Sequence, residues 1–209
     1  PYLAETIHLN FDIREDATTV TSATRYKRNG GGVVPLILDG EHMELLSVKI
    51  DGVSATYTST ESTLTIDAPP AEFTLEVVTR FDPAKNTALE GLYKSGGNYT
   101  TQCEAQGFRR ITYFQDRPDV MTVFTVRVEA DIATCPTLLS NGNLTDEGNA
   151  SAHRHFTVWH DPFPKPCYLF ALVAGRLEYI RDYFLTKSGR KVDLRIYVRD
   201  GDQKQCHYA

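Results

Sequence analysis

The sequence has no apolar stretch long enough to cross a bilayer. Its longest apolar run, residues 168–175, is far shorter than the roughly 18–20 residues that a transmembrane helix needs. Helical periodicity is almost absent as well, since only residues 109–114 fit a short helical turn, which has to end before Pro118. These absences argue against a membrane partner and against a helical bundle.

Positive charge is also scarce. The chain carries 22 Lys and Arg residues against 27 Asp and Glu residues, which leaves a net charge of −5. A surface that binds phosphate groups needs a basic patch, and no run of Lys and Arg supplies one. We therefore expect no nucleic-acid partner.

Cysteines are few, and none belongs to a C-x-x-C pair. Cys103, Cys135, Cys167 and Cys206 permit three disulfide pairings in an oxidising compartment, and buried free thiols are the simpler interpretation. A chain of 209 residues buries roughly 70 % of its unfolded surface, so it needs no disulfide or metal to hold a core. We expect free thiols.

Catalytic signatures are missing too. The chain has no H-E-x-x-H zinc motif, no phosphate-binding loop and no serine or cysteine nucleophile paired with a base. His153, His155 and His160 surround Trp159, and histidines two apart on a strand could ligate zinc with a third ligand. Because Arg154 lies between the first two histidines, we expect no metal site in this chain.

Two carboxylates, Asp116 and Asp119, flank Arg117. A catalytic acid pair needs one carboxyl group held in its protonated form, and the cation between these two opposes that. The sequence therefore predicts a structural turn held by a local ion pair.

What the sequence does contain is a period-two alternation of apolar and polar residues, the pattern of half-buried strands. The alternation runs through residues 7–13, 20–25, 33–38, 45–50, 64–66, 73–78, 124–128, 156–158 and 192–198. Pro162, Pro164 and Pro166 predict an extended lead-in to a buried strand at residues 168–175. Many short strands separated by Gly and Pro turns predict an all-β fold, either a sandwich or a saddle-like curved sheet.

Residues 86–108 contain the most irregular polar sequence. Residues 86–97 have no apolar period and three glycines, which predicts a flexible hairpin or loop. If the chain then runs extended, Gln102 and Glu104 share one face and Cys103 points to the other. A carboxylate beside an amide can bind an ammonium group, although spacing alone favours a solvated strand face that turns at Gly107.

Several strings resemble the N-terminal domain of the aminopeptidase N family. They are NTALEGLY at residues 86–93, TQCEAQGFR at 101–109, ITYFQDRPDV at 111–120, LLSNGN at 138–143, DPFPKPCYLFALVAG at 161–175 and SGR at 188–190. The match covers nearly the whole chain in order, and its DRPDV form is similar to the soluble bacterial and protozoan branch. The resemblance implies a saddle of β-sheet, residence in the cytoplasm and free thiols.

The resemblance also implies an enzyme, a zinc aminopeptidase that releases N-terminal amino acids from peptides with zinc-activated water. In that family the zinc motif and the G-A-M-E-N substrate motif lie in a thermolysin-like catalytic domain, and both motifs are absent from this sequence. The chain alone is therefore expected to bind no zinc and to be inactive. Carried over through the Q-C-E-A motif, Glu104 binds the α-amino group of the peptide substrate and Gln102 lines the same pocket.

The polar segment 199–205 marks the expected end of the domain. We expect residues 1–199 to form the β domain and residues 200–209 to begin the linker to the catalytic domain. An apolar patch that receives the catalytic domain is expected, with one edge at residues 102–114. The alternative is a stand-alone β-sandwich binding or adaptor module without catalysis, and an H-E-x-x-H motif further along the gene would separate the two.

Overall fold

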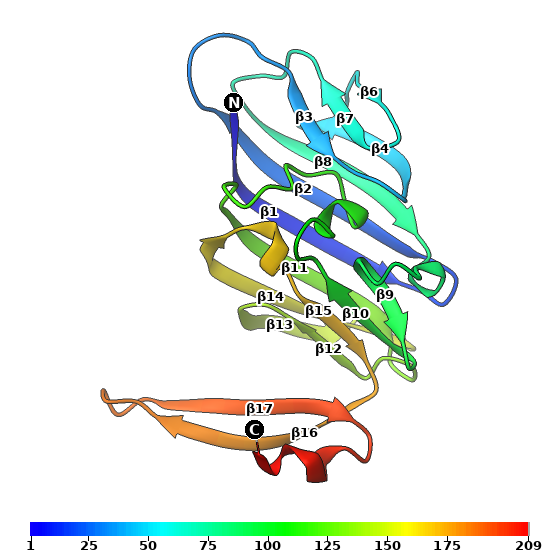
Figure 1. The fold of residues 1–209 in the computed structure, drawn as a ribbon, viewed down its shortest axis with the longest axis vertical. Helices are drawn as coiled ribbons and strands as arrows, with labels where there is room; N and C mark the ends of the chain where they lie inside the picture. The colour runs from blue at the N-terminus through cyan, green and yellow to red at the C-terminus, as the bar shows by residue number, and fades with distance from the viewer. Residues whose placement is uncertain (209) are drawn as a thin grey trace.

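The protein is built almost entirely from β-strands. The computed structural model describes residues 1–208, which contain seventeen strands, four 3-10 helices and no α-helix (Figure 1). None of the helices in these residues is long and apolar enough to span a membrane. The predicted all-β fold is confirmed.

The largest sheet has eight strands in the order β13-β14-β11-β1-β2-β8-β4-β5. Its strands are β1 (Tyr2–Ile13), β2 (Thr18–Arg28), β4 (Glu44–Ile50), β5 (Val53–Ser54), β8 (Glu72–Phe81), β11 (Thr122–Asp131), β13 (Asn143–Asn149) and β14 (Arg154–Lys165). Strands β1 and β11 are parallel, and the other neighbours are antiparallel. Along β1, Ile7, Leu9, Phe11 and Ile13 are buried, as the alternation predicts.

Three smaller sheets complete the fold. One contains β3 (Leu36–Asp39), β7 (Thr63–Ile66) and β6 (Thr58–Ser59), and a second contains β12 (Thr137–Ser140), β15 (Leu172–Gly175), β10 (Asn98–Gln102) and β9 (Gly91–Ser95). The third is a hairpin of β16 (Leu177–Leu185) and β17 (Lys191–Arg199). The 3-10 helices are η1 (Pro83–Lys85), η2 (Phe108–Arg110), η3 (Cys167–Leu169) and η4 (Gln203–Tyr208).

An aromatic cluster joins the large sheet to the segments that cross it. Phe11 of β1 and Phe124 of β11 stack on Phe170, with ring centroids 5.8 and 6.1 Å apart. Phe108 of η2 meets Phe114, Phe124 and Phe170 edge-on, and all of these rings are buried. Such aromatic pairs add about 0.5–1.5 kcal/mol each beyond their area burial. The cluster fixes η2, and with it the loop that precedes η2, against the sheet.

The structure departs from the predicted elements where tertiary contacts override the local pattern. The predicted strand at residues 168–175 begins instead as η3 and becomes β15 only at Leu172, because Phe170 turns inward to the aromatic cluster. Pro162 and Pro164 of the proline-rich lead-in lie at the end of β14, and Pro166 is the N-cap residue of η3. Pro162 and Pro164 lie beyond the residues that pair with β13, so no hydrogen bond to that strand is lost.

The four cysteines are free and buried, as predicted. Burial raises the pKa of the Cys103, Cys135 and Cys167 thiols above the ordinary value. A thiol that is both protonated and inaccessible is a poor nucleophile.

We expect Ellman's reagent at pH 8 to modify Cys103 and Cys167 in the folded chain at least roughly 100-fold more slowly than in urea, because the chain must open first. The control is the same chain unfolded in urea, where all four thiols should react within minutes. Rapid reaction of both residues under native conditions would show that this part of the core is open.

Candidate functional site

The loop at residues 102–107 joins the end of β10 to η2. Gln102 is the last residue of β10 and pairs with Gly91 of β9. Gln102 and Glu104 are exposed, while Cys103 between them is 2 % exposed. The burial agrees with the expected alternation, since both polar side chains reach solvent and the thiol faces the core, but the chain is extended only to Gln102, and Glu104 already lies in the turn.

Gly107 closes this loop against neighbouring backbone. Its N–H donates to the Cys103 carbonyl oxygen at 2.8 Å. A Cβ atom on Gly107 would lie 2.4 Å from the carbonyl oxygen of Gln102 and 2.8 Å from the amide nitrogen of Gly91. No other residue fits these distances, so a glycine here lets the loop pack directly on the β9–β10 hairpin.

The side chains of Gln102 and Glu104 are not hydrogen-bonded to each other. Gln102 Nε2 donates instead to the backbone carbonyl of Glu104 at 3.1 Å. Among residues 1–208, no hydrogen bond or ion pair engages the Glu104 carboxylate. Gln102 therefore stabilises the loop, and the carboxylate is open to a cation that approaches from outside.

Asp116 holds the start of η2 in place. Its carboxylate is 2 % exposed and accepts hydrogen bonds from the backbone N–H of Arg109 at 3.1 Å and from Arg109 Nε at 3.0 Å. The Cys167 thiol donates to its other oxygen at 3.0 Å, and burial followed by the Asp116 charge raises the pKa of this thiol. The Asp116 backbone N–H donates to Asp39 Oδ2 at 3.1 Å. Asp116 thus links η2 to β3 and η3.

The ion pair predicted around Arg117 involves only one of its two flanking carboxylates. Arg117 and Asp119 form two hydrogen bonds at 3.1 and 3.0 Å, which confirms a local ion pair. Asp116 pairs with Arg109 instead, because its side chain points into the core while Arg117 stays in water. Sequence neighbours alone did not reveal that partner, which lies seven residues away.

The three histidines make separate structural contacts. His155 Nε2 lies 2.7 Å from the Cys135 carbonyl oxygen, and His160 Nδ1 lies 3.0 Å from Thr125 Oγ1. His153 lies in the turn before β14, where its carbonyl accepts from Ile132 N–H. Within residues 1–208, no three His, Cys, Asp or Glu side chains are grouped to hold a metal ion. These donor atoms do not fit a zinc ion.

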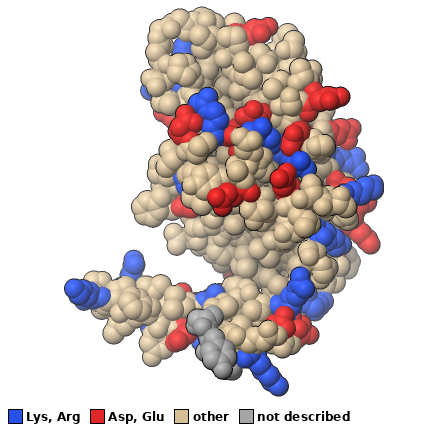
Figure 2. All heavy atoms as spheres, viewed as in Figure 1, with Lys and Arg blue, Asp and Glu red and all other residues tan. Residues whose placement is uncertain are grey.

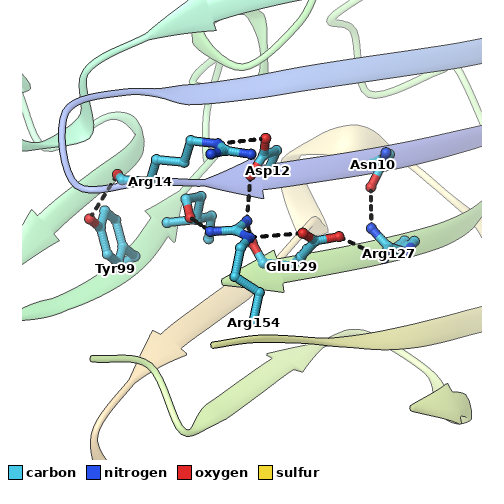
Figure 3. A network of polar contacts seen from close by, with 8 residues as sticks. Asn10, Asp12, Arg14, Tyr99, Arg127, Glu129 and Arg154 are labelled. Carbon is cyan, nitrogen blue, oxygen red and sulfur yellow. Dashed lines mark hydrogen bonds and ion pairs between the residues drawn. The ribbon is translucent and has the colours of Figure 1, made fainter. Parts of the chain in front are cut away.

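A polar network ties β1, β11 and β14 together (Figure 3). Arg154 donates to Glu129 at 2.8 Å and also to Asp12, while Arg127 donates to Glu129 at 2.7 Å and to Asn10 at 3.1 Å. Burial alone would raise the pKa of Glu129, but the hydrogen bonds from both arginines hold it below its ordinary value. Because each charge is paired inside the network, it stabilises the sheet and leaves no group open for a ligand.

Several cavities open on the surface, and two of them are of similar size. One has a volume of 470 Å³ and is lined in part by Arg80, Asn86 and Arg110; the other, of 480 Å³, adjoins the network around Arg154. Gln102 and Glu104 line neither cavity. The candidate amine site is thus an open surface loop in the described part of the chain, and a closed pocket around it would need a second surface.

Known proteins match the chain over its whole length. A sequence profile of the peptidase M1 N-terminal domain matches residues 10–169. Aminopeptidase N of Caulobacter vibrioides is 48 % identical over 212 residues, which cover 100 % of this chain and 24 % of that protein. The crystal structure of Legionella pneumophila aminopeptidase A in complex with aspartic acid superimposes with a TM-score of 0.93 at 31 % identity, covering 99 % of this chain and 25 % of that chain.

A more distant structure has the same fold. An M1 zinc metallopeptidase of Deinococcus radiodurans, bound to a Tyr-Ser-Ala substrate, superimposes with a TM-score of 0.81 at 16 % identity over 96 % of this chain and 48 % of that chain. The chain spans about a quarter of the length of the curated relative it matches.

Proposed function

The chain belongs to the peptidase M1 N-terminal domain family, and from that membership we propose that it recognises the substrate amine in a zinc aminopeptidase. The observation that carries the proposal is the exposed Glu104 carboxylate, which has no partner within residues 1–208 and sits on a loop anchored at both ends. In the proposal, Glu104 binds the α-ammonium group of a peptide, and Gln102 orients the loop that carries it.

The chemistry of the substrate suits this contact. A peptide α-amino group has a pKa of ~7.7–8.0, so it is mostly protonated at neutral pH. When the peptide leaves water for a closed pocket, its ammonium group needs a compensating charge. A carboxylate at a fixed position would also limit how far the peptide enters, so that only the first peptide bond reaches the reacting centre. One contact would then supply affinity and exopeptidase specificity together.

The zinc ion of such an enzyme does not fit the residues of this chain. The rings of His155 and His160 are hydrogen-bonded to separate groups, and the sequence has no H-E-x-x-H motif. In the proposal the zinc ligands lie in a catalytic domain that residues 1–209 do not include. Residues 1–199 are the β domain and residues 200–209 begin the connection. Residence in the cytoplasm is also proposed, and the four free thiols support it.

The proposal predicts a division of activity between two polypeptides. The 209-residue chain should bind no stoichiometric zinc and hydrolyse no aminoacyl reporter substrate, because it has no ligand set for the metal. The longer polypeptide encoded by the gene should release N-terminal residues from peptides and lose that activity on chelation. Elemental analysis and reporter hydrolysis check both statements.

Two outcomes would contradict the proposal. The first is about one zinc per isolated chain, lost on changing His153 and His155 to alanine. The second is a longer polypeptide that binds peptides but never cleaves them, which would favour a binding module.

A further inference from the structure

The 470 Å³ cavity lies where four parts of the chain meet. The start of β4, the end of β8, residues 82–88 and η2 all contribute to its lining. Small-molecule sites usually have volumes of about 300–1,000 Å³ and combine apolar walls with a few polar groups. The cavity therefore has room for a ligand of the size of an amino acid.

The contribution of η2 to this cavity is polar. Phe108, Ile111 and Phe114, in and after η2, are each 0 % exposed and belong to the core. The prediction of an apolar edge at residues 102–114 is therefore wrong. Arg110 is the η2 residue that lines the cavity.

Two of the cations that line the cavity are already neutralised. Arg110 pairs with Glu41 at 3.0 Å and with Glu90 at 3.1 Å. Lys85 pairs with Asp82 at 3.2 Å. Figure 2 shows Lys and Arg side chains interspersed with Asp and Glu side chains across the middle of the viewed face. These pairs leave little net charge to attract a simple anion or a simple cation.

Glu44 and Arg80 are a charged pair that the domain leaves without partners. They lie directly opposite each other on β4 and β8, and both line the cavity. Opposite positions of antiparallel strands place Cβ atoms roughly 4.5–5.5 Å apart, close enough for two long side chains to meet. Yet neither side chain forms an ion pair or a hydrogen bond with another of residues 1–208. A ligand that carries both charges would satisfy both groups at once.

The backbone beside these two residues is irregular. A β-bulge lies between Leu45 and Ser47, directly after Glu44. His42, which also lines the cavity, has a φ of 57°, in the left-handed region that residues other than glycine seldom adopt. Bulges redirect side chains, and strained backbone of this kind gathers at binding sites. Both features agree with a Glu44 side chain that does not meet Arg80 across the strands.

The rest of the lining is apolar and fixed in position. Met43 and Phe81 are partly buried and pack against the core, and Ala88 lies on the facing segment. Asn86 Nδ2 holds that segment by donating to the carbonyl oxygens of Glu90 at 2.7 Å and of residue 92 at 3.0 Å. An apolar group of the ligand would therefore find a preformed surface between the two charges and the core.

We propose that this cavity binds a free amino acid with an apolar side chain. Its ammonium group binds Glu44, its carboxylate binds Arg80, and its side chain lies against Met43 and Phe81. At pH 7 a free amino acid carries both of these charges. The reaction proposed above would release such molecules, but binding in this cavity does not rest on that function.

The test is isothermal titration calorimetry of the 209-residue chain at pH 7 with three probes. L-leucine carries both charges, L-leucinamide carries the ammonium group alone, and N-acetyl-L-leucine carries the carboxylate alone. We expect leucine to bind with a Kd of about 1 mM or below, and each of the other two to bind at least about tenfold more weakly. The same titrations of the longer polypeptide, taken as the difference between wild type and Glu44→Gln, cancel any leucine bound elsewhere.

Two variants assign the charges to their residues. Glu44→Gln should weaken leucine and leucinamide at least about tenfold and leave N-acetylleucine unchanged, whereas Arg80→Gln should weaken leucine and N-acetylleucine and leave leucinamide unchanged. The matched control is Glu61→Gln, at an exposed glutamate between β6 and β7 that lines none of these cavities. Glu44 and Arg80 are exposed, so both variants should keep the urea midpoint of the wild type.

Several results would overturn the amino-acid site. They are no leucine binding, N-acetylleucine or leucinamide binding as tightly as leucine, and equal effects of the Glu44 and Glu61 variants. Leucine binding that Glu104→Ala abolishes and Glu44→Gln does not would place the ligand on the exposed loop instead. An active longer polypeptide without leucine binding in this cavity contradicts this proposal alone, and leucine binding with an inactive longer polypeptide contradicts the enzymatic function alone.

Discussion

Replacing Glu104 with alanine in the longer polypeptide should lower kcat/KM for peptides with a free N-terminus by at least about 30-fold. Loss of one partner from a buried, charged hydrogen bond costs about 2–5 kcal/mol, and each ~1.4 kcal/mol is tenfold in rate. Gln102→Ala should cost less, because the Gln102 side chain contacts the loop backbone and carries no charge. Steady-state kinetics on the purified variants measures both effects.

The Glu104 result can be separated from a folding defect. Because its carboxylate has no partner among residues 1–208, Glu104→Ala should leave the urea midpoint of the 209-residue chain unchanged. Gln106→Ala, at another exposed position of the same loop, should leave kcat/KM unchanged. N-acetylated peptides, which have lost the positive charge, should no longer distinguish wild type from the Glu104 variant. Wild-type kcat/KM for free-amine peptides in Glu104→Ala would remove this residue from the substrate site.

Replacing Asp116 with alanine should cause the largest loss of stability among the changes considered, about 3 kcal/mol. The substitution removes the acceptor of Arg109 Nε and of the Arg109 backbone N–H, and it also frees the Cys167 thiol. The Arg109 guanidinium keeps only a 3.9 Å ion pair with Asp39 and its hydrogen bond to the backbone carbonyl of residue 116. The Arg109 side chain keeps 20 % exposure, so some of the lost interaction is recovered from water. For a chain of this size the melting temperature should fall by roughly 6–12 °C.

The matched control for Asp116 is Asp119. Its ion pair with Arg117 is exposed on both sides, at 68 % and 58 %, and exposed pairs contribute less than about 1 kcal/mol. Asp119→Ala should therefore leave the urea midpoint almost unchanged. If the two alanine variants unfold at the same urea concentration, Asp116 does not hold η2 in the way its hydrogen bonds indicate.

Together these two predictions distinguish a residue that binds the substrate, Glu104, from a residue that stabilises the domain, Asp116. Glu104 is exposed and makes no contact that stabilises the domain, so its cost should appear in kinetics alone. Asp116 is buried and hydrogen-bonded to Arg109 of η2, so its replacement should lower the free energy of unfolding of the domain. Asp116→Ala should also weaken substrate binding at temperatures below unfolding, because the loop that carries Glu104 leads directly into η2. A site on an exposed loop needs such rigid support to hold a charge in one position.

The sequence by itself determined where most long strands lie and which of their residues face the core. Alternation predicted β1, β2, β8 and β11, because successive side chains of a strand point to opposite faces of the sheet. A strand with one buried face therefore alternates apolar and polar residues in the sequence. Alternation also predicted that an extended chain would place Gln102 and Glu104 on one face and Cys103 on the other, and the burial of these residues agrees, although the chain already turns at Glu104. The resemblance carried by the Q-C-E-A string suggested the role of Glu104, which remains a prediction.

Tertiary structure decided what each buried face packs against. Alternation states that a side chain is buried but carries no information on its partner, because the partner comes from a distant part of the chain. Phe170 therefore turned out of its expected strand into the aromatic cluster, and Asp116 paired with Arg109 and not with its neighbour Arg117. The same reason explains β17, whose alternation at residues 192–198 indicated a buried face, although Leu194 is 44 % and Ile196 is 37 % exposed in the described residues.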